Sequence, residues 1–201
     1  MDDIRNDENG IPDKETFDAV CRAVSDSSFT PVYDKIDKSA AARCGSLELH
    51  RGLCQVGDLN FLRFFQNLRN LSVQSERLKG LGAVSLLHEL ESLFIGGARV
   101  DTLRPLAACK GLKRLTLADV RVHDGDFSPL CGLIQLEALE MSGCGVTGID
   151  WLTGHPNLES LRLDDNPVAD FGPLRTLPQL EFVGFSGEMF EPPFAGLPGC
   201  G

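Results

Sequence analysis

Residues 90–95, LESLFI, and residues 112–117, LKRLTL, share one pattern of apolar residues and begin 22 residues apart. Five further segments follow the pattern and begin at residues 44, 68, 136, 158 and 180, with the sequences CGSLEL, LRNLSV, LEALEM, LESLRL and LEFVGF. Successive starts are separated by 24, 22, 22, 24, 22 and 22 residues, so seven units, which we number repeats 1 to 7, cover residues 44–193. A regular period of this length predicts a solenoid of stacked repeats.

Other positions of the repeat test this register, because they are apolar as well. Apolar residues recur nine, six and three residues before each start after the first, and again at the eleventh position of every unit. Among these twenty-five positions only His155 is clearly polar. The agreement between the columns supports the same boundaries for every unit.

Each unit contains a short x-Leu-x-Leu strand in which two apolar residues stand at alternate positions, as Leu115 and Leu117 do in repeat 4. Alternating side chains of a strand point to one side, and a single strand cannot bury that side unless neighbouring units stack on it. We therefore predict an α/β solenoid with a curved parallel β-sheet on its concave side. A 22-residue period leaves little room for full helices, so short 3-10 turns are expected on the convex side.

The repeat pattern L-x-x-L-x-L-x-x-N/C-x-L resembles the leucine-rich-repeat family, and the 22-residue period is similar to that of bacterial internalins and SDS22-type phosphatase regulators. The resemblance implies a solenoid that binds other proteins. One column departs from the family, whose ninth position usually carries an asparagine that satisfies backbone groups inside the turn. Here that position reads Gly52, Glu76, Ala98, Val120, Cys144, Asn166 and Glu188. Only Cys144 and Asn166 fit, so most turns must satisfy their backbone groups in another way.

The flanks of the repeats differ from them in composition. Residues 1–12 are acidic and are expected to be disordered, and residues 194–201 form a Pro- and Gly-rich tail. Residues 13–43 are expected to cap the N-terminal end, because the open end of a solenoid exposes its core. Within this cap, residues 14–25 predict a helix with Asp13 as its N-cap. Its apolar face consists of Phe17, Val20, Cys21 and Val24.

The chain is acidic, with 19 basic and 29 acidic residues and a net charge of −10. Such a charge disfavours nucleic acid as a ligand and favours a protein partner with a basic patch, although it also simply promotes solubility. The N-terminus does not resemble a signal peptide, no run of residues is apolar enough to cross a membrane, and the seven cysteines are scattered. We expect a cytoplasmic protein that does not bind membranes and is monomeric when free.

The sequence shows no catalytic motif, so we predict no enzymatic activity, no cofactor and no metal. Phosphate-binding loops and nucleophile elbows are absent. The segment His123-Asp124-Gly125-Asp126 resembles a metal site only superficially and is interpreted as a polar loop. His155 is expected to be a hydrogen-bonded histidine of the core.

The predicted binding surface consists of polar positions beside the strand leucines, on the concave face. Phe94 is its one large apolar side chain at the fifth position, and Gly96 and Gly97 beside it should leave the ring uncovered. An exposed aromatic ring in a cleft is typical of an interface anchor, although the ring could instead lean onto Thr116. The predicted partner-binding residues are His50, Phe94, Arg114, Thr116, Asp119, Glu140, Arg162, Asp164 and Asp165.

Charge is also unevenly distributed along the solenoid. Residues 136–181 contain eight acidic residues but only Arg162 and Arg175 as basic ones. Two functions remain open. In the first, the protein is an inhibitor, similar to immunity proteins, whose concave face occludes a basic partner. In the second, it is an adaptor or regulatory subunit like the SDS22-type proteins, and it holds a phosphatase or another complex without blocking it.

Overall fold

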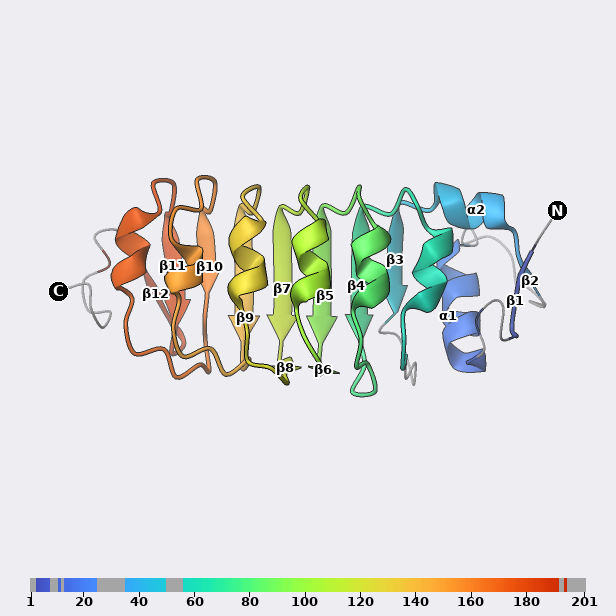
Figure 1. The fold of residues 1–201 in the computed structure, drawn as a ribbon, viewed down its shortest axis with the longest axis horizontal. Coiled ribbons are helices and arrows are strands. Elements are labelled where there is room, and N and C mark those ends of the chain that lie inside the picture. Colours follow the sequence, from blue (N-terminus) through green and yellow to red (C-terminus); the bar gives the residue numbers. More distant parts are fainter. Residues whose placement is uncertain are drawn as a thin grey trace.

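The computed structural model describes residues 3–7, 11, 13–24, 35–49, 56–191 and 194. Its main element is an eight-stranded sheet in the order β12-β11-β10-β9-β7-β5-β4-β3 (Figure 1). The strands are β3 (Ser46–Leu49), β4 (Asn70–Gln74), β5 (Ser92–Gly96), β7 (Arg114–Ala118), β9 (Ala138–Ser142), β10 (Ser160–Arg162), β11 (Phe182–Phe185) and β12 (Glu188–Phe190). The seven strands β3 to β11 pair in parallel, one from each repeat, as the periodicity predicts.

The strands pair at equivalent positions of the repeat. Leu71 lies opposite Leu93, which lies opposite Leu115 in the next strand. These leucines point into the core, while the residues between them, such as Ser72 and Thr116, remain partly exposed. The sheet therefore has one buried face and one face open to solvent, which we call the open face and which corresponds to the predicted concave side.

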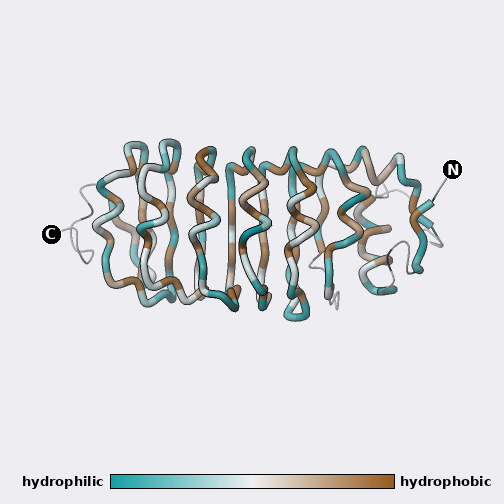
Figure 2. Tube along the Cα trace, viewed as in Figure 1, coloured by the Kyte–Doolittle hydropathy of each residue, from teal (hydrophilic) through white to brown (hydrophobic). Residues whose placement is uncertain are grey.

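Short 3-10 helices cover the buried face of the sheet, as predicted for the return segments (Figure 1). They are η1 (Asn60–Phe64), η2 (Gly82–Leu86), η3 (Arg104–Ala108), η4 (Ser128–Gly132), η5 (Asp150–Leu152) and η6 (Gly172–Thr176). Each contributes one apolar residue that is at most 1% exposed, namely Leu62, Val84, Leu106, Leu130, Leu152 and Leu174. Together with the strand leucines they form one continuous core, and hydrophilic residues gather in the turns at both edges (Figure 2).

Asn166 occupies the ninth position of repeat 6 and satisfies backbone groups of the turn, as the sequence predicts for an asparagine there. Its Oδ1 accepts hydrogen bonds from the backbone N–H groups of Cys144 (3.0 Å) and Val146 (2.9 Å) in the preceding repeat. Its Nδ2 donates to the carbonyl oxygens of Met141, Leu163 and Asp164. Cys144 fills the same position one repeat earlier, and its thiol donates to the carbonyl oxygen of Leu117 at 3.1 Å.

The turns without asparagine are satisfied by backbone pairing and by other side chains. Beyond the main sheet, β6 (Arg99–Val100) and β8 (Arg121–Val122) pair in parallel as a second, two-stranded sheet. In addition, the N–H of Arg121 donates to the carbonyl oxygen of Ala98 at 2.9 Å. In repeat 2, the buried Ser75 hydroxyl donates to the carbonyl oxygen of Val56 at 2.8 Å. The apolar residues Ala98 and Val120 can therefore occupy the ninth position without leaving these backbone groups unpaired.

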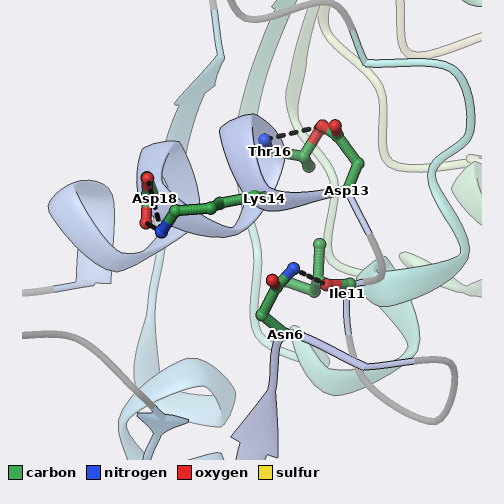
Figure 3. Close-up of polar contacts among 6 residues, drawn as sticks. All are labelled: Asn6, Ile11, Asp13, Lys14, Thr16 and Asp18. Carbon is green, nitrogen blue, oxygen red and sulfur yellow. Dashed lines mark hydrogen bonds and ion pairs between the residues drawn. The ribbon is translucent and has the colours of Figure 1, made fainter.

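The N-terminal cap contains the predicted helix, α1 (Lys14–Val24), which packs against β3. Asp13 caps it, because its Oδ2 accepts a hydrogen bond from the N–H of Thr16 at 2.7 Å (Figure 3). The predicted apolar face is buried at Phe17, Val20 and Cys21 and half-buried at Val24. A second, short helix, α2 (Lys38–Arg43), lies between α1 and the first repeat and is capped by Asp37.

Part of the segment that was expected to be disordered is ordered instead. β1 (Ile4–Arg5) pairs with β2 (Lys35–Ile36) in an antiparallel ribbon, and Ile4 and Ile11 are buried. Asn6 Nδ2 donates to the carbonyl oxygen of Ile11 at 2.7 Å (Figure 3). Because residues 1–12 are acidic overall, their composition gives no indication that these two isoleucines are buried. Their burial stabilises the ordered segment.

The C-terminal end of the sheet is closed by a hairpin rather than by a complete seventh repeat. β12 turns back and pairs antiparallel with β11, so that Val183 lies opposite Phe190. Phe194 then packs into the core and is 7% exposed. The prediction of seven equivalent units holds for the strand of repeat 7 but not for its second half, where the hairpin replaces the usual turn.

His155, the one polar residue in the apolar columns, is buried as expected for a core histidine. Its Nδ1 lies 2.9 Å from the carbonyl oxygen of Leu152, and its Nε2 lies 3.3 Å from that of Leu130 in the preceding repeat. Cys109 occupies the same column, and its thiol donates to the carbonyl oxygen of Val84 at 3.5 Å. Polar side chains are thus accepted in this column because a carbonyl oxygen of the preceding 3-10 helix lies within reach.

Candidate functional site

The predicted binding residues at the fifth position form one row across the open face. Phe94 pairs with Thr116, Thr116 with Glu140, and Glu140 with Arg162 in successive strands β5, β7, β9 and β10. Neighbouring strands are about 4.8 Å apart, so the four side chains form a contiguous surface. The sequence register predicted this row, and the strand pairing confirms that its members are neighbours.

Phe94 is half-buried, and its ring extends toward the carboxyl end of its own strand. A Cβ atom added to Gly96 would come within 3.1 Å of Cε1 and Cζ of the ring, so the ring lies over this glycine. The ring therefore leans along β5, over Gly96. Glycine at position 96 gives Phe94 a fixed place while one face of the ring remains available for contact.

The Phe94 ring lines an open groove of about 1200 Å³ at the carboxyl ends of β4, β5 and β7. We call it the strand-end groove. Its lining comes from these strand ends and from the turns that follow them, and consists of Gly57, Gln74, Glu76, Arg77, Lys79, Phe94, Gly96, Gly97, Arg99, Ala118, Asp119, Arg121 and Gly143. Of the predicted binding residues, the groove brings together Phe94 and Asp119.

The strand-end groove is lined by more cations than carboxylates. Arg77, Arg99 and Arg121 occupy the tenth position of repeats 2, 3 and 4, and Lys79 lies two residues after the first of them. Glu76 and Asp119 are the two lining carboxylates. The predicted binding residues do not include these arginines, and their signal in the sequence is an arginine at the tenth position of three consecutive repeats.

Asp119 and Asp165 lie in turns that require an unusual backbone. Their φ angles are +54° and +57°, and the glycines at the same eighth position, Gly97 and Gly143, have φ angles of +67° and +66°. This left-handed region strongly favours glycine and tolerates aspartate and asparagine. The small residues in this column are thus explained by the backbone, and both aspartates remain exposed at the edge of the open face.

Asp164 has a structural contact in addition to its predicted binding role. Its Oδ1 accepts a hydrogen bond from the N–H of Gly187 at 2.7 Å and so links repeat 6 to the turn of repeat 7. Arg162 lies over Gly184, where an added Cβ atom would approach its Cγ to 3.1 Å. Arg114 is exposed at the start of β7. His50, the remaining predicted residue, lies outside the described residues.

A second apolar patch on the sheet was not predicted. Phe182 in β11 and Met189 in β12 are 38% and 54% exposed. A Cβ atom added to Gly184 would come within 3.2 Å of the Met189 sulfur, so Met189 lies over the same glycine as Arg162. Phe182 occupies the third position of its repeat, where the other repeats carry smaller or charged side chains such as Ser160.

The carboxylates of the polar loop at His123 accept hydrogen bonds from backbone N–H groups of the same turn. Asp124 Oδ1 accepts a hydrogen bond from the N–H of Asp126, and Asp126 Oδ1 accepts one from the N–H of Ser128. The N–H of Asp126, together with the Thr102 hydroxyl, holds the pKa of the Asp124 carboxyl below its usual range. Within the described part of the chain, no three His, Cys, Asp or Glu side chains gather as metal ligands would, and no helix is long and apolar enough to cross a membrane.

Comparison with known proteins identifies the fold. No family model and no curated protein sequence matches the chain. Among solved structures, the internalin InlF from Listeria monocytogenes superposes with a TM-score of 0.73 at 19% identity, over 86% of this chain and 49% of the internalin. InlP from the same organism superposes with a TM-score of 0.66 at 16% identity, over 88% of this chain and 51% of its own. This chain thus spans about half the length of these two internalins.

A third similar structure is a plant peptide hormone receptor, RGFR1, in complex with RGF2. It superposes with a TM-score of 0.51 at 16% identity and covers 63% of this chain and 22% of the receptor. At such identities the similarity concerns the fold, and it agrees with the stacked strands and 3-10 helices described above.

Proposed function

We propose that this chain, which has the leucine-rich-repeat fold, is a non-enzymatic module that binds another protein with the open face of its sheet. The observation that carries the proposal is the half-buried Phe94 ring, which lies over Gly96 in the strand-end groove. Aromatic side chains at the centre of a sheet surface are frequent anchors of protein interfaces, because they bury a large area at a small cost in conformational entropy.

The row of side chains beside Phe94 supports the same surface. Thr116, Glu140 and Arg162 come from three successive strands of a rigid sheet, so little ordering is required when a partner binds. The peptide-bound receptor among the similar structures agrees with a role in binding. A rigid, contiguous and mostly polar surface with one aromatic anchor is typical of protein recognition.

The finer proposal is that the protein is a cytoplasmic inhibitor of the immunity type that occludes a basic partner. Its support is the charge of repeats 5 to 7, where Glu140, Asp164 and Asp165 accompany five further acidic residues between 136 and 181. Acidic surfaces of this kind accelerate association with basic proteins. In this arrangement the acidic end contacts the partner's basic patch while Phe94 anchors the interface.

The experiment is a pull-down from lysate of the source cells with the purified protein as bait, followed by measurement of Kd for the retained partner. Phe94→Ala and Glu140→Lys change the open face, and Glu89→Lys makes the same charge change at an exposed position before β5, away from the row. We expect Phe94→Ala to weaken binding roughly 30-fold, which corresponds to about 2 kcal/mol. Glu89→Lys should bind like the wild type.

The outcomes separate the functions. Loss of binding in both open-face variants, with circular dichroism unchanged, supports the surface, and abolition of a basic partner's activity supports the inhibitor. A partner that stays active in the complex supports an adaptor or regulatory subunit instead. Retention of the partner by both folded variants rules out the open face as the binding site.

A further inference from the structure

The strongest feature that the proposed function leaves unexplained is the line of arginines in the strand-end groove. Arg77, Arg99 and Arg121 are all exposed and stand at equivalent positions of three consecutive repeats. Arg99 and Arg121 lie directly opposite each other in the parallel pair β6 and β8. Neighbouring strands are about 4.8 Å apart, and like charges placed opposite each other destabilise a sheet.

None of these charges is neutralised within the described part of the chain. Ion pairs among the described residues include those of Lys14 with Asp18, Lys35 with Asp3, and Arg69 and Lys113 with Glu91. The four groove cations, Lys79 included, take part in none of them. An unpaired row of arginines is unexpected in a chain with a net charge of −10, where carboxylates are abundant.

The two carboxylates of the groove form no ion pair with this row within the described part of the chain. The Asp119 carboxylate is directed toward repeat 5, because a Cβ atom added to Gly143 would come within 2.4 Å of its Oδ1. Glu76 lies beside Gly97, 3.9 Å from the corresponding Cβ position. Four cations and two carboxylates leave the groove with a positive local charge.

We propose that the strand-end groove binds an acidic segment of a partner protein. In this complex the carboxylates of the segment pair with Arg99 and Arg121, and an apolar side chain of the segment packs on the Phe94 ring. Guanidinium groups bind carboxylates through two parallel hydrogen bonds, which makes arginine better suited than lysine to this task. The inference rests on the proposed protein-binding function and adds the chemistry of one contact to it.

The dimensions of the groove favour a short peptide segment over a nucleic acid. Two steps between repeats span about 10 Å, which is the length of roughly three extended residues. Nucleic acids require a longer track of cations, and the acidic repeats 5 to 7 next to the groove would repel a continuing phosphate backbone. The division of charge along the open face instead fits a protein partner that carries an acidic segment beside its basic patch.

The test uses the purified full chain and does not need the natural partner. The probe is a short fluorescein-labelled peptide of glutamates interrupted by leucines, and a lysine-for-glutamate peptide is its counterpart. Binding is measured by fluorescence anisotropy at low ionic strength for the wild type, Arg99→Gln, Arg99→Glu and the double variant with Arg121→Glu. Arg104→Glu in η3, on the opposite side of the repeat, is the matched control.

We expect the wild type to bind the glutamate peptide and not the lysine peptide. Arg99→Glu should weaken binding about tenfold, and the double variant should abolish it, whereas Arg104→Glu should bind like the wild type. Phe94→Ala should also weaken binding of the leucine-containing peptide and leave that of a peptide of glutamates alone unchanged. Thermal unfolding should show Arg99→Gln at least as stable as the wild type, because the substitution relieves repulsion.

Several results would overturn the inference. Equal binding of the glutamate peptide by the wild type and the double variant would remove the arginines from the site. If single-stranded DNA binds the wild type more tightly than the glutamate peptide does, and the double variant loses this binding, the groove is assigned to nucleic acid. A dimer of the wild type that the double variant dissolves would assign the groove to a second copy. The peptide could fail to bind at all while the protein still binds its partner in a way that Glu140→Lys abolishes. This result would reject the groove as a peptide site and leave the proposed function standing.

Discussion

At the scale of single residues, Asn166 satisfies backbone groups in two neighbouring repeats. Its amide contacts five backbone groups of repeats 5 and 6 from a buried position. We expect Asn166→Ala to destabilise the protein by about 2–4 kcal/mol, because it leaves buried N–H groups without acceptors. Urea unfolding followed by circular dichroism measures this loss.

The control for this variant is Asn157→Ala, because the Asn157 amide makes one exposed hydrogen bond to the carbonyl oxygen of Ile134. Its loss should cost about 1 kcal/mol or less. Equal effects of the two substitutions would mean that the turn of repeat 5 finds other partners for its N–H groups.

Buried thiols provide a second prediction at this scale. Burial raises the pKa of Cys109 from its ordinary value of 9.0 to about 11. The folded state therefore keeps a proton that the unfolded chain releases, so the stability contributed by this thiol is complete below pH 9 and falls as the pH rises toward 11. We expect wild type and Cys109→Val to differ in their free energies of unfolding in a pH-dependent way, with the wild type losing up to about 1.4 kcal/mol more per pH unit in this window.

The same burial controls reactivity toward thiol reagents at pH 8. Burial also raises the pKa of Cys144 to about 11 and that of Cys21 to about 12, whereas Cys131 is exposed. Cys131 should react with Ellman's reagent in the native protein, and the three buried thiols should react only after unfolding. Mass spectrometry of the labelled protein identifies the sites, and rapid native labelling of Cys109 would contradict a closed core.

At the scale of elements, two ion pairs that share Glu91 connect the starts of three neighbouring strands. Glu91, just before β5, accepts from Lys113 and Arg69, each at 3.1 Å. The Lys113 ammonium, hydrogen-bonded to the carboxylate, lowers the pKa of Glu91. The contribution of the Glu91 ion pairs to the free energy of unfolding is therefore present above the ordinary pKa of a glutamate. It is lost as the pH falls through the lowered pKa of Glu91.

We expect Glu91→Gln to have a slightly lower Tm than the wild type at pH 7. The difference should shrink in high salt and vanish in acid, where the wild-type carboxyl is protonated as well. Scanning calorimetry of the pair over pH and salt provides the check, with Glu89→Gln, at an exposed position two residues earlier in the chain, as the control. A difference that survives at low pH would point to packing rather than charge.

Elements inside the repeats were predictable and elements outside them were largely not. The leucine columns predict the seven parallel strands of the main sheet and the 3-10 helices of the described repeats, because the same positions recur in every repeat. β1 and β12 have no such repetition, and their burial depends on partners, Ile36 and Val183, that are distant or specific to the end of the solenoid. The α1 helix lies between these cases, since its amphipathic face and its Asp13 cap are local signals.

The candidate site also combines features that the sequence predicts with features that it does not. The row from Phe94 to Arg162 follows from the strand register, so the sequence predicts it. The position of the Phe94 ring over Gly96 does not follow, because it depends on a side-chain rotamer. The positive φ of Asp119 and the pairing of β6 with β8, which places Arg99 beside Arg121, become visible only when the turns are built.

At the scale of the whole molecule, the stability should increase with the number of repeats, because each repeat contacts mainly its neighbours. Deletion of residues 90–111, one complete repeat, joins Glu89 to Leu112 and preserves every column. We expect this shortened protein to unfold cooperatively, with a lower free energy of unfolding and a lower urea m-value than the full chain. Deletion of half a repeat, residues 90–100, should prevent folding, and a half-deleted protein with native-like unfolding would contradict the repeat boundaries.

The antiparallel return of β12 has a consequence for how such a molecule can grow. Because Val183 already pairs with Phe190, the outer edge of β11 offers no place for another parallel strand. At the opposite end, α1 covers β3. A longer version of this architecture would therefore arise by duplication of an internal module, inserted between two existing ones, while both ends are inherited unchanged. Because of the hairpin, a repeat can be added inside the solenoid but not onto the outer edge of β11.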